Sequence, residues 1–321
     1  MGFFDRLAHR FGYAPAPPST HGKHSRAFAG AKMDRLTASW MAGTNSINQE
    51  LRNDLNRLRA RSRDLAKNND YAKKFVSMCV ANIVGKDGFN FQSRCEEKDG
   101  KPDNLANTAI ESALYDWMRR GTCEISGRMG FADLQRACVS ALARDGEYLI
   151  RKVVGKSAGN KYQYALQFLD IDRLDTQHNQ TAASGRNAIV MGVEIDSYRR
   201  PVAYWIFESH PSDGVQGGRV RVRVPAAEII HDFLPEHAEQ LRGVPWMSAA
   251  ILTMHHLTEF ENSALIAARK GADTLGFFTS PDGGAPPIGD GTIEDTPIST
   301  SVPGTFDTLP DGYTFQQYDS K

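Results

Sequence analysis

Long apolar runs, a secretory signal and a net charge are all missing from this sequence of 321 residues. No apolar run approaches the ~18–20 residues needed to cross a bilayer, and the N-terminus lacks the apolar core of a signal peptide. We therefore expect no membrane association. Lys plus Arg and Asp plus Glu number 38 each, so no bulk charge draws the whole molecule onto nucleic acid.

Cysteine is also scarce, and the four cysteines show no C-x-x-C spacing. Cys79 and Cys138 lie in apolar helical patterns, where a reduced thiol behaves as a small hydrophobe. Cys95 and Cys123 complete the set. This usage favours a reducing cytoplasm as the place where the chain is made.

The sequence lacks the motifs of several enzyme classes. No G-x-G-x-x-G follows a predicted strand, which excludes the dinucleotide fingerprint, and no H-E-x-x-H is present. Residues 153–159 (VVGKSAG) share the letters GKS with the phosphate-binding loop. The first glycine of that loop would fall at Ile150, and the stretch lies between two predicted strands, so it predicts a tight hairpin instead.

Histidines and carboxylates do not gather into a recognisable site. His255 and Glu259 lie one helical turn apart, but two ligands are too few for zinc. His231 and His237 fall near a strand end and a loop, and we expect the histidines to be incidental. A glycine that ends a helix before a strand explains the carboxylates of ARDGE at 143–147. We predict no catalytic, cofactor-binding or metal-binding residue and no enzymatic activity.

The charges that are present are unevenly distributed. Residues 1–80 hold fourteen Lys and Arg against six acids, whereas residues 241–321 hold four against ten. Ordinary solvated surface explains this pattern, and the alternative is a molecule whose two ends meet different partners.

Hydrophobic periodicity predicts helices in the first half of the chain. Leu51, Leu55, Leu58 and Leu65 recur at helical spacing from Asn48 onward, with an arginine-rich face outside this stripe. We expect Asp70 to cap a second helix that ends at Gly85. Helices are also predicted over 105–119 and 131–145.

A turn and a strand are predicted over 85–95, between the second and third helices. After the last of these helices, strands are predicted at 147–154, within 164–174, on both sides of a turn at 198–201, within 218–234, and at 274–280. Between the last two lies a helix that begins near Val244–Pro245, with proline in its first turn. It can run to Gly271, about 40 Å at 1.5 Å per residue.

Four blocks in this order resemble the lambda-like family of tailed-bacteriophage portal proteins. They begin NRLRARSRDLAKNNDYAKKF, FADLQRACVSALARDGEYLI, GVEIDSYRRPVAYWIFESHP and VPAAEIIHDFLPEHAEQLRGVPW, and span about residues 48–275. The resemblance implies an α+β portal fold with a helical and β-stranded wing, a long stem helix and a small α/β clip. The family's second stem helix and crown would follow, and the sequence ends before them, so we expect it to be truncated.

The resemblance also implies a division into domains. We expect a flexible N-terminal arm at 1–40, the wing at 41–240, the stem helix at 241–273 and the clip region at 274–321. A stem must pack against identical neighbours, and small residues suit it because they let helices approach closely. These are Ala249, Ala250, Ser263, Ala264, Ala267 and Ala268.

What the resemblance implies about function is a ring, twelve subunits in this family, at one vertex of the capsid. Double-stranded DNA passes through the ring during packaging and ejection. The implied partners are the terminase large subunit, the major capsid or scaffold protein, head–tail joining proteins and other copies of the chain. We expect assembly in the host cytoplasm, a final place in the virion, no cofactor and no membrane.

Three groups of residues are candidates for these roles. We expect Glu259, Arg269 and Lys270 on the stem to face the channel. Gly146, Glu147, Arg242, Gly243 and Pro245 are predicted to form a structural motif. Arg57, Arg59 and Arg61 are candidates for contact with DNA or a partner. They carry the alternative hypothesis, a DNA-binding capsid assembly or scaffold protein that uses the arginine-rich helix 52–63.

Overall fold

A computed structural model describes residues 43–213 and 220–273 and four short strands beyond them. The chain divides into two units, Met1–Ser46 and Ile47–Lys321. The predicted arm at 1–40 and most of the predicted clip at 274–321 lie outside the described residues. Among the described helices, none combines the length and the apolar character that a membrane span requires.

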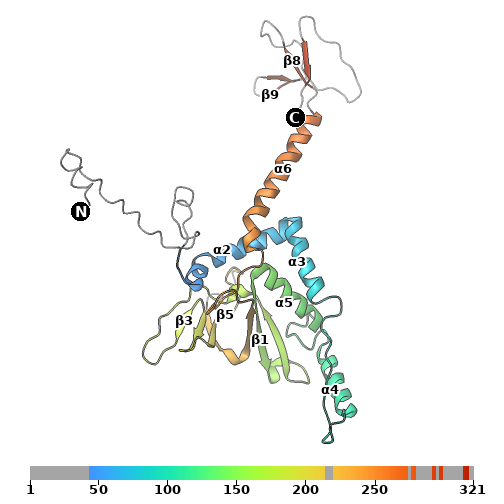
Figure 1. Cartoon of the computed structure of the whole chain (residues 1–321), viewed down its shortest axis with the longest axis vertical. Helices are drawn as coiled ribbons and strands as arrows, with labels where there is room; N and C mark the ends of the chain where they lie inside the picture. Colours follow the sequence, from blue (N-terminus) through green and yellow to red (C-terminus); the bar gives the residue numbers. More distant parts are fainter. Residues whose placement is uncertain are drawn as a thin grey trace, which may run out of the picture. The chain divides into compact units, whose positions relative to one another are not determined.

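Two consecutive helices open the second unit (Figure 1). Helix α2 (Ile47–Asn68) buries Leu51, Leu55 and Leu65, which confirms the predicted stripe. Helix α3 (Asp70–Ile83) is capped by Asn69, whose Oδ1 accepts a hydrogen bond from the Ala72 N–H at 2.9 Å. The prediction of Asp70 as the cap was wrong by one residue.

Helices α4 (Asn104–Trp117) and α5 (Phe131–Asp145) are close to their predicted ranges. The strand predicted over 85–95 does not form. Helix side chains bind its backbone instead: Gln135 Oε1 accepts from the Phe89 N–H, and Glu111 Oε1 accepts from the Ser93 N–H. These side chains satisfy donors that a strand partner would otherwise take.

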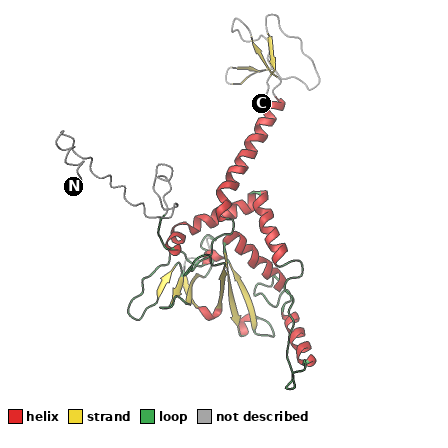
Figure 2. Ribbon diagram, viewed as in Figure 1, coloured by secondary structure: helices red, strands yellow, loops and turns green. Residues whose placement is uncertain are grey.

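Two antiparallel sheets form the centre of the unit (Figure 2). The first has the order β2-β1-β7, with β1 at Glu147–Val154, β2 at Tyr164–Leu169 and β7 at Ile229–Phe233. The second has the order β3-β4-β5-β6, with β3 at Ala188–Val190, β4 at Val193–Ile195, β5 at Pro201–Phe207 and β6 at Arg221–Pro225. Short 3-10 turns η2 (Lys156–Ala158), η3 (Ile171–Arg173) and η4 (Ala226–Glu228) connect the strands.

The core has two layers because successive residues of β1 point to opposite faces of the sheet. Leu149 packs with Val193 and Ile206 in the cluster that joins the two sheets. Ile150 packs with Trp117 and Leu134 in the cluster beneath α4 and α5. The helices therefore cover one face of the first sheet, and the second sheet contributes to the core on the other.

Helix α6 (Ile251–Asp273) follows a single 3-10 turn, η5 (Ser248–Ala250). Its 23 residues make it about 34 Å long. The predicted start at Val244–Pro245 was wrong by six residues. Beyond α6 the structure describes β8 (Gly276–Thr279) paired with β11 (Thr314–Gln317), and β9 (Gly291–Ile293) paired with β10 (Thr296–Ile298). The α+β class predicted from the sequence is confirmed.

Candidate functional site

One carboxylate, that of Glu147, binds groups from α2, from β7 and from the segment that leads into α6. Glu147 is fully buried at the start of β1. Its Oε1 accepts from Arg59 Nη2 at 2.5 Å, and His231 Nε2 lies 2.8 Å from Oε2. Arg242 Nε lies 2.9 and 3.1 Å from the two oxygens, and the Gly243 N–H donates to Oε2 at 2.8 Å. We call these five residues the Glu147 junction.

The charge of Glu147 compensates two buried guanidinium groups. Burial alone would raise the pKa of Glu147, but Arg242, the hydrogen bond with His231 and Arg59 together hold that pKa well below its ordinary value. Glu147 is therefore ionised at neutral pH. A buried charge is tolerated only when it is paired and hydrogen-bonded, and both oxygens of Glu147 have such partners. Arg242 Nη2 lies 2.8 Å from Oε1 as an ion-pair contact, without the geometry of a hydrogen bond.

Further acceptors complete the pairing of the two arginines. Arg59 Nη1 donates to Asp172 Oδ1 at 3.2 Å, and Arg59 Nε donates to the Asp145 carbonyl at 3.4 Å. Arg242 Nη1 donates to the Met191 carbonyl at 2.7 Å. The junction thus binds the backbone of the turn between β3 and β4 and the end of α5.

Residues 240–247, which we call the strap, are buried except for the half-buried Val244 and Trp246, although they have no regular secondary structure. Such a segment must find partners for its backbone outside a ladder. Asn48 of α2 supplies one of them, since its Oδ1 accepts from the Leu241 N–H at 3.0 Å. Its Nδ2 donates at 2.8 Å to the carbonyl of Glu239, the residue that precedes the strap. Gln240 Nε2 donates to the Arg242 carbonyl at 2.8 Å.

Two glycines let the strap cross the corner between α5 and β1. Gly146 ends α5 with φ +87°, and a Cβ there would overlap the Val244 carbonyl and the Pro245 nitrogen. A Cβ on Gly243 would overlap the Gly146 carbonyl. Both positions require glycine because the two backbones touch.

The residues predicted to form a structural motif do come together. Gly146 and Glu147 form the corner, and Arg242, Gly243 and Pro245 belong to the strap that crosses it. The role predicted for Pro245 was wrong. It is buried at the crossing, in the turn closed by the bond from the Ser248 N–H to the Pro245 carbonyl, and does not open α6.

The three arginines predicted to contact DNA or a partner have different environments. Arg57 and Arg61 are exposed, but Arg59 is 2% exposed and belongs to the Glu147 junction. Arg59 is therefore unavailable to a phosphate, and its assignment was wrong. The exposed charged residues of α2 are mixed in sign: Arg52, Arg57, Arg61 and Lys67 against Glu50, Asp54 and Asp64. This surface gives little support to the DNA-binding alternative.

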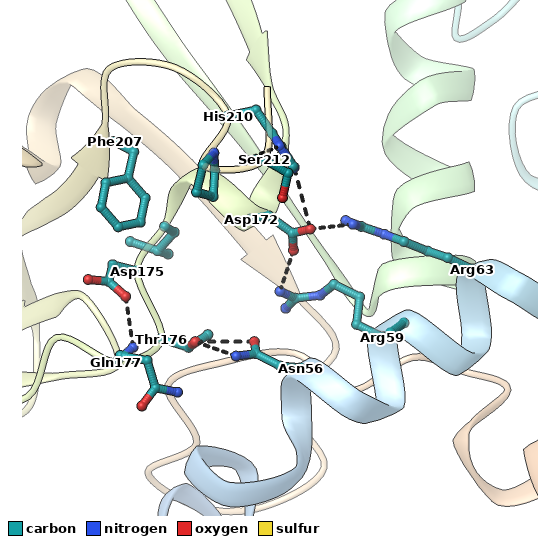
Figure 3. Close-up of a pocket in the computed structure, with 13 residues that line it drawn as sticks. Asn56, Arg59, Arg63, Asp172, Asp175, Thr176, Gln177, Phe207, His210 and Ser212 are labelled. Atoms are coloured by element: carbon teal, nitrogen blue, oxygen red, sulfur yellow. Dashed lines mark hydrogen bonds and ion pairs between the residues drawn. The ribbon is translucent and has the colours of Figure 1, made fainter. Parts of the chain in front are cut away.

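A pocket of about 270 Å³ lies beside the junction (Figure 3). Asp170, Asp172 and His210 are the one group of possible metal ligands that the described part of the chain brings within 4.8 Å. Arg63 binds Asp170 Oδ1 at 3.2 Å and also Asp172 Oδ2, while Arg59 binds Asp172 Oδ1. The arginines already satisfy these carboxylates, so the group is an ion-pair network.

Helix α6 presents three different faces. The first contacts α2 and α3 through Ile251, Met254, Thr258 and Glu261. The second, which we call the uncharged face, is exposed and recurs at spacings of three and four: Thr253, Leu257, Phe260, Ala264, Ala267 and Ala268. The third, the polar face, is exposed and contains His255, His256, Glu259, Asn262, Ser263, Arg269 and Lys270, with Leu252 and Ile266 among them.

Two of the three residues predicted to face a channel share one direction on α6. Glu259 and Lys270 are exposed and lie about 20° apart around the helix, within the polar face. Arg269 is also exposed, but it lies about 100° from Lys270, at the edge of the polar face beside the first face. Glu259 also lies 3.3 Å from His255 Nε2 and 3.7 Å from His256 Nδ1, with all three side chains more than half exposed. Among the small residues predicted for helix packing, Ala264, Ala267 and Ala268 share the uncharged face. Ser263 lies on the polar face, and Ala249 and Ala250 precede α6.

Sequence reasoning missed two residues of the site. His231 was considered incidental, yet its side chain is 3% exposed and contacts Glu147. Asn48 was read only as the start of a helix. The alternation of β7 could have pointed His231 inward with Ile229, but no local pattern reveals its partner 84 residues away.

The stretch 153–159 forms the predicted hairpin connection. Gly155–Gly159 also fit the nucleophile pattern G-x-S-x-G, which needs a strand-to-helix turn. Here Ser157 lies in the turn η2 between the antiparallel strands β1 and β2. The required context is therefore absent from this part of the described chain.

Comparisons with known proteins agree with the order of motifs. A family model described as "Phage portal protein, lambda family" matches residues 33–321. The "Probable portal protein" of Halomonas phage phiHAP-1 is 33% identical over 336 residues, which cover all of this chain and 64% of that protein. The chain thus spans less than two thirds of the length of this relative.

Two solved structures give more distant matches. A chain in the neck of an empty GTA particle, computed with C6 symmetry, is 14% identical with a TM-score of 0.48; the match covers 83% of this chain and 62% of that one. A chain in the virion of a native gene transfer agent particle is 15% identical with a TM-score of 0.42, covering 83% and 61%. Likeness at this level carries no argument about function.

Proposed function

Since the chain belongs to the lambda family of phage portal proteins, we propose that it forms an oligomeric ring through which phage DNA passes. Family membership makes it a portal protein, a structural component of the phage particle. The proposal adds that copies of α6 pack side by side around a central channel, with twelve copies in the complete ring.

The exposed faces of α6 support this proposal. From Asn262 to Lys270 every side chain is exposed. Two of these side chains are large and apolar, Leu265 at 68% exposed and Ile266 at 59%. A helix with so little contact of its own requires a partner to bury its apolar surface. The uncharged face repeats at the spacing of helix–helix packing, and its alanines allow a neighbouring helix to approach closely.

The polar face suits a surface that DNA slides along. Among its exposed residues are one acid, Glu259, and two bases, Arg269 and Lys270, and these charges nearly cancel. A strongly basic wall would bind phosphates and release counterions, which would hold the DNA in place. A nearly neutral wall binds DNA weakly. We infer that the polar face, with these three residues, faces the channel.

The remaining roles follow from the same proposal. The ring would sit at one vertex of the capsid, serve both packaging and ejection, and bind the terminase large subunit, the capsid or scaffold protein and head–tail joining proteins. The chain would supply no catalytic group, so the energy for packaging would come from the terminase. The wing would comprise the two sheets with α2 to α5, and α6 would be the stem helix.

A charge introduced on the uncharged face of α6 tests the packing. In the full-length protein, Ala264→Asp should prevent ring formation while leaving the circular dichroism and Tm of the subunit unchanged, because Ala264 is exposed in the single chain. The matched control is Ser263→Asp, which places the same charge on the polar face. Mass photometry that finds equal ring assembly for the two variants would contradict the proposed packing.

A further inference from the structure

We propose that Glu147 is a positioning residue that fixes the direction in which α6 leaves the sheets, and that this direction sets how neighbouring copies meet. The first part concerns the single chain and needs no ring. The second part rests on the function proposed above.

Glu147 ties two groups of elements together. On one side it belongs to β1, and it contacts His231 of β7 in the same sheet. On the other side it binds Arg59 of α2 and, in the strap, the side chain of Arg242 and the backbone of Gly243. One carboxylate thus connects the first sheet both to the helix beside α6 and to the segment that leads into it.

The start of α6 is attached to that same helical group. Met247 and Ile251 pack against Leu65 at the end of α2 and Ala72 of α3. Asn69 Nδ2 donates to Thr258 Oγ1 at 2.7 Å, and Tyr71 donates to Glu261 Oε1 at 2.9 Å. Since α6 is bound to α2 and α3 over its first eleven residues, its direction follows theirs.

Among the described residues, no contact beyond Glu261 constrains the direction of α6. Residues 262–270 are exposed on every face of α6 in the single chain. A rotation of about 10° at the start of a helix about 34 Å long moves its far end by about 6 Å. Such a displacement exceeds the tolerance of close helix packing, so a small change at the junction becomes a large change at the contact between copies.

The other attachments of the strap are weaker in kind. Asn48 supplies neutral hydrogen bonds, and in the bond from Arg242 Nη1 to the Met191 carbonyl only the donor is charged. A hydrogen-bonded pair of opposite charges is stronger, and Glu147 makes the only ion pair of the strap among the described residues. Replacing that carboxylate should release the strap before it unfolds the sheets.

Hydrogen exchange of the full chain tests the first part. Glu147→Gln should raise the exchange rate of the strap amides and the first turns of α6 at least about tenfold more than it raises that of the β4 and β5 amides. Glu194 provides the control, since it is also buried and paired with an arginine, but in the second sheet. Glu194→Gln should instead raise the exchange rate of the β4 and β5 amides more than that of the strap amides. Unchanged strap exchange in Glu147→Gln, or a uniform increase along the chain, would overturn the proposal.

Glu147→Asp keeps the experiment decisive if Glu147→Gln does not fold. It retains the charge and withdraws the carboxylate by one methylene, so it should give the same local pattern with a smaller increase. Direction is measured separately, as the distance between spin labels on non-natural residues at Val154 and Ser263, both exposed. The distribution should broaden or shift in the Glu147 variants and not in Glu194→Gln; an unchanged distribution would overturn the assignment.

Mass photometry of the same variants tests the second part. Rings of the unsubstituted protein should give one copy number, and Glu147→Asp should give a broader or shifted distribution, while Glu194→Gln should match the unsubstituted protein. Normal rings from Glu147→Asp would overturn the link to assembly. If the unsubstituted protein forms no ring, the proposed function fails, while the exchange and distance results still decide the role of Glu147 in the single chain.

Discussion

At the scale of residues, the molecule depends on how buried charges are paired. Arg59 and Arg242 are 2% and 0% exposed, and both bind one fully buried carboxylate. A buried charge without its partner is far more costly than a surface ion pair is worth. Substitution of Glu147 should therefore lower the free energy of unfolding more than substitution of a carboxylate in a surface ion pair.

Removal of this charge should cause a large loss of stability. We expect Glu147→Gln to lower the free energy of unfolding by about 3–5 kcal/mol, because two guanidinium groups remain buried without their carboxylate. Arg223→Gln, which removes a partly exposed partner of Glu194, should cost about 1 kcal/mol or less. Urea denaturation measures both values, and comparable losses would show that the junction is not a centre of stability.

Part of the dependence of stability on pH can be assigned to a second carboxylate, that of Glu194. Hydrogen bonds from Arg223, with a further one from Asn187, outweigh burial and lower the pKa of Glu194 from 4.5 to about 2. A lowered pKa in the folded chain gives stability that is present above pH 4.5 and is lost as the pH falls toward 2. Glu194→Gln should therefore lower stability by about 1–2 kcal/mol at pH 7 and by less at pH 3. Denaturation at both values tests this; an equal loss would exclude the carboxylate as the cause.

The sequence predicted the residues that obey local patterns and missed those fixed by distant partners. Gly146 was recognised as a helix end because glycine before a strand is a local signal. Arg59 was grouped with the exposed arginines because its partner, Glu147, lies 88 residues away. The role of His231 was missed for the same reason, since it also contacts Glu147. Burial of a charge depends on a tertiary partner, which periodicity does not contain.

At the scale of elements, α6 shows where local rules stop. Proline is common in the first turn of a helix, and the predicted start of α6 rested on Pro245 for this reason. The backbone crossing at Gly146 holds Pro245 in the strap instead, and α6 begins only at Ile251. A long helix in this part of the chain was nevertheless predicted, although its length of about 40 Å was too great because the start was placed too early.

The turn between α2 and α3 offers a test of one residue against its neighbour. Asn69→Ala should lower the free energy of unfolding by about 1–2 kcal/mol, since it removes both the cap of α3 and the hydrogen bond to Thr258. Asp70→Ala should cost less, because Asp70 is exposed in the first turn of α3 and contributes mainly through the helix dipole. Thermal denaturation that ranks the two in reverse would contradict the observed cap.

At the scale of the whole molecule, the single chain is incomplete by its own chemistry. The sheets and α2 to α5 enclose cores of their own, whereas α6 beyond its first eleven residues has exposed apolar and polar faces and no partner among the described residues. Packing of identical copies would bury the uncharged face and leave the polar face toward the centre. Subunits would then meet through geometry, and no residue would need to make or break a covalent bond.

Imaging of the purified full-length protein by electron microscopy tests this account most directly. We predict closed rings of about a dozen copies, with α6 around the central opening and Glu259, Arg269 and Lys270 facing it. Monomers or dimers at high protein concentration, or rings that place α6 on the outer rim, would contradict it.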